Sequence, residues 1–185
     1  MNLHEYKEKA LRTESKVDRI VANAVELNYV FGAFQVVSEM LDCLKKKIYY
    51  NNPKKYDEQF HDLAAKLHYM TTCCDRHHDI IENSELPIDP RVFHGIIGLA
   101  TESGELITAL QTALNGHPID PVNVMEEMGD QNWYSAILHD ALNLNPEETL
   151  DKNINKLAKR YPEKYSDTSA DVRDLDAERS ILEGK

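Results

Sequence analysis

The chain has 185 residues, a formal net charge of −11 and 42% hydrophobic residues. This length is typical of one domain with a sizeable core. The negative charge argues against a protein that grips duplex nucleic acid through its phosphates, so we expect no nucleic acid polymer as a partner. An apolar run long enough to cross a bilayer and a signal peptide are both missing from the pattern, and three cysteines form no disulfide framework, so we expect a cytoplasmic protein and no membrane partner.

The glycine content is low, at seven residues, and no alternating strand pattern is present, which together predict an all-α fold. In chain order, helices are expected over residues 3–11, 21–50, 53–82, 89–114, 120–142, 145–161 and 173–182, with a linker at 83–87. Four helix starts carry an Asx-Pro pair, in which the Asx side chain caps the free amides and proline suits the first turn. These pairs are Asn52-Pro53, Asp89-Pro90, Asp120-Pro121 and Asn145-Pro146.

Two pairs of acidic residues stand on the helices expected over 89–114 and 120–142. Glu102 and Glu105 are spaced at i, i+3, as are Glu127 and Asp130, so each pair shares one helix face. The 21 residues between Glu105 and Glu127 allow one helix to end and an antiparallel one to begin. Four converging carboxylates repel one another unless a cation lies among them, and oxygen ligands suit Mg²⁺, with Mn²⁺ as a substitute. We therefore predict that all four are metal ligands and catalytic residues for a phosphorylated substrate.

The glycines around these acids favour a site over an ordinary solvated face. Gly98, Gly104 and Gly129 lie within the expected helices, where glycine costs about 1 kcal/mol relative to alanine. Room for the close approach of another helix or of a ligand would explain this cost.

Other polar residues have two readings. Asn153, Lys156 and Arg160 form one stripe, which is either a solvated face or a set of donors for phosphate oxygens. His94, Trp133 and Tyr134 flank the acids, and Trp133 or Tyr134 either belongs to the core or stacks on a base. We take as candidate substrate-binding residues Asn153, Lys156, Arg160, His94 and Trp133.

Two further patterns are given a structural interpretation. Cys and His pairs on the helix over 53–82 cannot easily supply four tetrahedral zinc ligands from one helix; they are Cys73, Cys74, His77 and His78. The segment from Gly32 to Asp62 also echoes, weakly, the segment from Gly95 to Asp130, and we attribute this to the general likeness of acidic amphipathic helices.

Three segments resemble the MazG-like branch of the all-α nucleoside triphosphate pyrophosphohydrolases, and the small phage-type members most closely. They are His94–Glu105, Glu126–Tyr134 and Asn153–Pro162, joined by similar features in residues 1–13 and 173–178. The resemblance covers residues 1–13 and 89–182. It implies a MazG-like helical bundle at 1–185 that forms one catalytic domain, into which 14–88 is inserted as a helical hairpin in place of a short connection.

The resemblance also implies an activity. Members of this family hydrolyse (deoxy)nucleoside triphosphates to the monophosphate and pyrophosphate, with Mg²⁺ bound at positions that match Glu102, Glu105, Glu127 and Asp130. Residues similar to Asn153 and Lys156 contact the substrate. Members usually associate, so we expect a homo-oligomer, a dimer or tetramer, which works in the host cytoplasm if a phage encodes it.

Two other classes remain as alternatives. A di-iron carboxylate bundle needs two Glu-x-x-His pairs, of which the chain has Glu58 with His61 and no second. A catalytically inactive helical binding module would not need the four acids.

Overall fold

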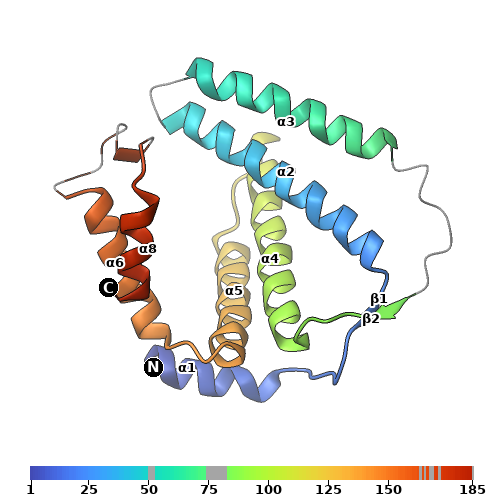
Figure 1. The fold of residues 1–185 in the computed structure, drawn as a ribbon, viewed down its shortest axis with the longest axis vertical. Coiled ribbons are helices and arrows are strands. Elements are labelled where there is room, and N and C mark those ends of the chain that lie inside the picture. Colours follow the sequence, from blue (N-terminus) through green and yellow to red (C-terminus); the bar gives the residue numbers. More distant parts are fainter. Residues whose placement is uncertain are drawn as a thin grey trace. The chain divides into compact units, whose positions relative to one another are not determined.

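A computed structural model describes residues 1–49, 53–73, 83–162, 164, 166, 169–170 and 172–184 (Figure 1). It confirms the predicted all-α class. The helices are α1 (Leu3–Ala10), the 3₁₀ turn η1 (Leu11–Thr13), α2 (Ala24–Tyr49), α3 (Pro53–Cys73), α4 (Pro90–Leu114), α5 (Pro121–Ala141), α6 (Pro146–Arg160) and α8 (Leu175–Glu183). In the described part of the chain, no helix is long and apolar enough to cross a membrane.

One short departure from helix occurs where residues 21–50 were expected to be helical throughout. Val21 and Ala22 form strand β1 (Val21–Ala22), which pairs antiparallel with strand β2 (Ser84–Glu85) in the predicted linker. The helix α2 then begins only after Asn23, whose side chain accepts hydrogen bonds from two backbone N–H groups of its first turn. The cap at Asn23 therefore determines where this helix starts.

The chain divides into two compact units. The first contains Met1–Ile20, Pro87–Glu163 and Asp174–Lys185, and the second contains Val21–Leu86 and Lys164–Arg173. Each is described separately below.

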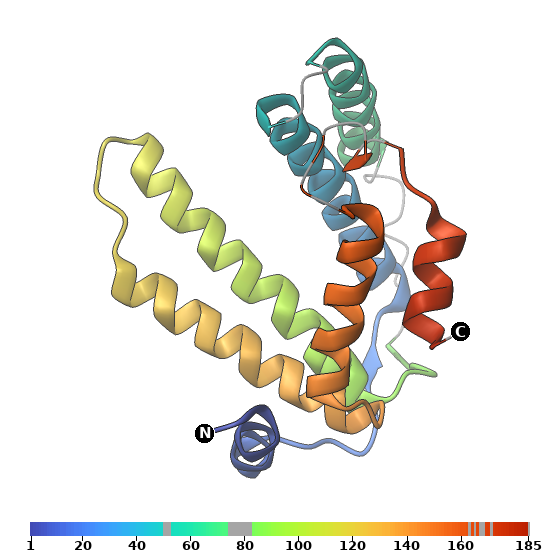
Figure 2. The same cartoon turned by 90° about the vertical axis from the view of Figure 1, so that its left-hand side faces the viewer.

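The first unit is built on the antiparallel hairpin of α4 and α5 (Figure 2). Both helices begin at the predicted Asx-Pro pairs: Asp89 accepts hydrogen bonds from two backbone amides of α4, and Asp120 from one of α5. Between them the chain turns at Gly116, whose φ of +84° is in the left-handed region that favours glycine. The position of the hairpin thus follows from capping and turn residues that the sequence displays.

Three further helices belong to this unit. The helix α1 packs on α5, and α6 packs on α8 (Figures 1 and 2). Asn145 caps α6 by accepting a hydrogen bond from the Glu148 N–H at 2.9 Å. The packed interior includes Ala10, Ala136 and Ile137, each less than a tenth exposed.

The second unit is a hairpin of α2 and α3, which Figure 1 shows side by side. Val36, Cys43 and Tyr56 are among the buried residues of this hairpin. In the remaining predicted capping pair, Asn52-Pro53, Asn52 lies outside the described residues. Residues 74–82 of the helix expected over 53–82 also lie outside them.

Candidate metal centre

The helices α4 and α5 approach each other closely because two glycines of α4 face large side chains of α5. A Cβ atom added to Gly95 would lie 2.6 Å from Leu138 Cγ, and one added to Gly98 would lie 2.1 Å from the ring of Tyr134. Neither distance is tolerable between carbon atoms, so only glycine permits this packing. Gly98 therefore fulfils the expectation of a close helix approach.

The other two glycines near the acids have no such packing role. A Cβ atom at Gly104 or Gly129 would meet no atom within 4 Å. Open space beside the acids is compatible with the second half of the expectation, room for a ligand.

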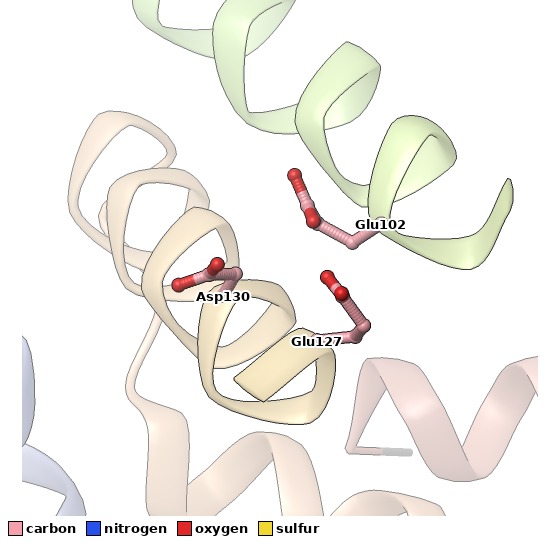
Figure 3. Close-up of side chains that lie close together, drawn as sticks. All are labelled: Glu102, Glu127 and Asp130. Atoms are coloured by element: carbon pink, nitrogen blue, oxygen red, sulfur yellow. The ribbon is translucent and has the colours of Figure 1, made fainter. Parts of the chain in front are cut away.

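Three of the four predicted carboxylates meet between the two helices. One oxygen each of Glu102, Glu127 and Asp130 lies within 4.8 Å of the others, and Figure 3 shows Glu102 on α4 opposite Glu127 on α5. Glu102 is 8% and Glu127 5% exposed, whereas Asp130 is exposed. We name these three residues the acidic cluster. Among the described residues it is the one group of three or more potential metal ligands that lie this close together.

The electrostatics of the acidic cluster favour a bound cation. Burial raises the pKa of Glu102, and its hydrogen bond with Glu127 and the charges of Glu105 and Asp130 raise it further. The hydroxyl of Thr101, which donates to Glu102 Oε1 at 3.3 Å, lowers that pKa and only partly offsets these effects. Two buried carboxylates in contact are stable when they share a proton or bind a metal ion. The oxygen-only donor set fits a hard divalent cation such as Mg²⁺.

A neighbouring amide holds one of the ligands in place. Asn123 Nδ2 donates a hydrogen bond to Glu127 Oε1 at 2.6 Å, one turn earlier on α5. This contact helps to fix the orientation of the Glu127 carboxylate, as hydrogen bonds to metal-binding carboxylates do.

Glu105, the fourth predicted ligand, lies outside the acidic cluster. Its side chain is exposed on α4, one turn beyond Glu102. It is nevertheless close enough for its charge to raise the pKa of both Glu102 and Tyr134. Glu105 therefore borders the site without joining the three packed carboxylates.

Two tyrosines near the acids were not among the predicted site residues. Burial raises the pKa of Tyr134, and so do the charges of Glu102, Asp130 and Glu105. Burial and the charge of Asp130 raise the pKa of Tyr6, whose hydroxyl donates to the Gly129 carbonyl at 3.2 Å. The position of Tyr134 four residues after Asp130 was a usable signal, since it places both on one face of α5. Tyr6 comes from α1, and only the packing of α1 on α5 brings it here.

The side chain of Trp133 links α5 to the N-terminal helix α1 and to η1. Its indole N–H donates to the Ala10 carbonyl at 3.1 Å and to Thr13 Oγ1 at 2.9 Å, which ties α1 and η1 to α5. The rings of Trp133 and His94 meet edge to face with centroids 5.7 Å apart. The one donor of Trp133 is thus occupied, and only its ring is left for contact with a ligand.

The predicted basic stripe on α6 divides into two parts. Arg160 forms a two-pronged ion pair with Glu178 of α8, at 2.8 and 2.7 Å, in which Glu178 is 5% exposed. This pair raises the pKa of Arg160 and commits its guanidinium to joining α6 to α8, which favours a structural role over phosphate binding. Lys156 is half-buried and Asn153 exposed. The acidic cluster is supplied by α4 and α5 alone, so neither belongs to it.

The second hairpin carries a counterpart of the acidic site. Gly32 of α2 faces Met70 of α3, as Gly95 of α4 faces Leu138 of α5. Gly32 lies 63 positions before Gly95, and Met70 lies 68 positions before Leu138. The same offsets place Glu39, Asp42, Gln59 and Asp62 where α4 and α5 carry Glu102, Glu105, Glu127 and Asp130. Those four side chains line a pocket of about 360 Å³ together with Cys43 and Leu63.

This counterpart lacks the features of a metal site. Gln59 stands in the place of Glu127, and Asp42 forms ion pairs with Lys45 and Lys46, both at 2.6 Å. The ion pairs neutralise the charge that a cation would otherwise balance. The echo in the sequence thus recurs at corresponding positions of the two hairpins.

The remaining predicted patterns are quickly placed. Cys74, His77 and His78 lie outside the described residues, as does the side chain of Cys73. Glu58 and His61 are both exposed on α3 and belong to no group of metal ligands among the described residues.

No protein-family model, curated protein or solved structure matches this chain.

Proposed function

We propose that this protein is a MazG-like, Mg²⁺-dependent hydrolase that converts (deoxy)nucleoside triphosphates to monophosphate and pyrophosphate. The observation that carries the proposal is the acidic cluster, three carboxylates from facing helices within 4.8 Å of one another, two of them buried. A protein gains nothing in stability from such an arrangement without a cation, because burial and mutual repulsion both oppose ionisation. The three resembling segments supply the reaction class.

Glu102, Glu127 and Asp130 would hold the metal, and Glu105 borders it. A bound Mg²⁺ supplies charge neutralisation for the triphosphate and an activated water. Asp130 is exposed to solvent and therefore accessible to a substrate, while Glu102 and Glu127 are buried between α4 and α5. Glu105, outside the close-packed three, would accept the proton of the attacking water at its carboxylate.

In the proposed reaction, water adds to the α-phosphorus and the bond between that phosphorus and the α,β-bridging oxygen breaks. The products are a nucleoside monophosphate and pyrophosphate. Tyr134 can orient the phosphate oxygens, since its neutral hydroxyl can serve as a donor, whereas the hydroxyl of Tyr6 already donates to the Gly129 carbonyl. Lys156 remains a candidate for phosphate contact, and Arg160 is reassigned to the α6–α8 pair.

A product analysis tests this function. A panel of canonical deoxynucleoside and nucleoside triphosphates would be incubated with the protein and Mg²⁺, and the products resolved by phosphorus NMR. We expect pyrophosphate and a monophosphate with at least one substrate, and loss of turnover in Glu102→Gln with the helical content unchanged. Release of orthophosphate and a diphosphate would exclude attack at the α-phosphorus. Full activity in Glu102→Gln would exclude the acidic cluster as the site.

A further inference from the structure

A pocket in the first unit lies at the start of α4. It has a volume of about 380 Å³, within the range of small-molecule sites. Its walls are mostly apolar, formed by Val17 and Ile20 of the segment after η1 and by Phe93 and Ile97 of α4. We name this the N-terminal pocket. Neither the acidic cluster nor the residues predicted from the sequence, apart from His94, belong to it.

The chemistry of the N-terminal pocket suits a flat, partly apolar ligand with polar edges. Phe93 and His94 offer rings for stacking, and Lys16 and Arg19 lie on the opposite segment. Lys16 is held 3.7 Å from a carboxylate oxygen of Glu14, a side chain with no exposed surface.

The segment that forms this wall is fixed to the helices that carry the acidic cluster. Arg91 at the start of α4 donates two hydrogen bonds to Glu14, at 2.5 and 2.9 Å, and also pairs with Asp140 of α5 at 2.9 Å. The bidentate geometry gives a well-defined orientation. The pocket is therefore pre-formed on the same hairpin as the acids.

The pocket and the acids lie along one helix. His94, Ile97, Thr101 and Glu105 follow at i, i+3, i+7 and i+11, so they share one stripe of α4. At 1.5 Å per residue, Ile97 precedes Glu102 by roughly 7.5 Å along the axis. Thr101, between them, bonds to Glu102. A ligand in the pocket that extends along this stripe would reach Thr101 and Glu105, the two residues of the stripe that neighbour Glu102.

We propose that the N-terminal pocket receives the base and sugar of the nucleoside triphosphate whose phosphates bind at the acidic cluster, an inference that rests on the proposed function. The base packs against Phe93 and His94, and the sugar and phosphates follow α4 towards Thr101 and Glu102. The pocket then distinguishes a nucleotide from an inorganic polyphosphate, which the acidic cluster alone does not do.

Trp133 provides a built-in reporter for this proposal. It is the one tryptophan of the chain, and its ring lies edge to face against His94, which lines the pocket. Its fluorescence would be titrated, with Mg²⁺ present, with the α,β-imido analogues of the four canonical deoxynucleoside triphosphates and separately with tripolyphosphate. We expect at least one analogue to bind about tenfold or more tightly than tripolyphosphate, a ratio in line with base stacking.

Two matched variants separate the pocket from general charge effects. Val17 lines the pocket and Val122 stands at the start of α5 outside it, and both are 63% exposed. Val17→Asp places a carboxylate where the base would lie, so it should remove most of the preference for the nucleotide while tripolyphosphate affinity stays the same. Val122→Asp should change neither, and circular dichroism would verify that both variants fold.

The outcomes distinguish the two proposals. Glu102-dependent hydrolysis of nucleotides with no effect of Val17→Asp on their affinity would overturn this inference and leave the proposed function in place. Equal weakening of nucleotide and tripolyphosphate would also overturn it, because the effect would be one of charge alone. Binding of neither ligand, with no hydrolysis, would overturn both.

Discussion

Gly98→Ala tests how closely α4 and α5 are packed beside the acidic cluster. A methyl group at Gly98 would lie 2.1 Å from the Tyr134 ring, whereas ordinary contact begins at 3.4 Å, so the ring or the helices must move by about 1.3 Å. The contact includes the Cγ atom at the root of the ring, and the ring also meets His94 and Trp133 at centroid distances of 5.4 and 4.9 Å. The ring therefore has little freedom to turn away.

The size of the effect follows from two opposing contributions. Overpacking of this kind costs about 1–3 kcal/mol, and replacing a helical glycine by alanine returns roughly 1 kcal/mol. Gly104 lies six residues further along α4, where an added methyl group meets nothing within 4 Å. Gly104→Ala should therefore raise the free energy of unfolding by roughly 1 kcal/mol relative to the wild type. The Gly98→Ala variant should be less stable than the Gly104→Ala variant by about 1–3 kcal/mol.

Urea unfolding followed by circular dichroism measures both variants without metal. The difference between them isolates the clash, because the helix preference of alanine is common to both. Gly98→Ala should also lower turnover, since it displaces Tyr134 from its place beside Glu102. If Gly98→Ala proved as stable as Gly104→Ala, the close packing of Tyr134 on α4, and the account of why glycine stands there, would be wrong.

Four further outcomes are expected. The raised pKa of Glu102 means that the folded, metal-free protein binds the proton of this carboxyl group more tightly than the unfolded chain does, so the associated stability is present at low pH and is lost as pH rises from 4.5 through the raised pKa. Urea unfolding at several pH values should show the wild type losing stability relative to Glu102→Gln as the pH rises. Parallel pH curves for the two proteins would contradict the raised pKa of Glu102. Arg160→Leu should lower the free energy of unfolding by about 3 kcal/mol because it removes the guanidinium that pairs with the buried carboxylate of Glu178. The double variant Arg160→Leu/Glu178→Leu should recover much of that loss. Failure of the double variant to recover, with a selective rise in KM, would restore Arg160 to substrate binding. Replacing Glu39 by Gln and Asp42 by Asn should leave turnover nearly unchanged, and a loss equal to that from the same treatment of Glu102 and Glu105 would mean that both hairpins supply ligands. Light scattering should give at least twice the chain mass of 21.2 kDa, because large apolar side chains such as Ile96, Leu110 and Met125 are more than half exposed; a monomer at assay concentration would contradict this.

The local features of this protein could be predicted from its sequence. The Asx-Pro pairs at Asp89, Asp120 and Asn145 act as helix caps because capping depends on residues within one turn. The i, i+3 spacing of the acids placed each pair on one face for the same reason. A short connection between two capped helices then brought Glu102 opposite Glu127, so three of the four predicted carboxylates meet.

Contacts between distant residues were decided by the tertiary structure. Arg160 pairs with Glu178, 18 residues away on α8, and the Trp133 N–H bonds to Thr13, 120 residues away on η1. No local rule selects these partners, since their geometry depends on how whole helices pack. Glu102 and Glu105 have the same side chain and lie on the same helix, yet only Glu102 is buried against α5. The reason is the rotation of α4 about its axis, which is set by the packing of Leu138 on Gly95 and of Tyr134 on Gly98. The sequence determined which carboxylates were available, and the packing of two glycines determined which of them meet.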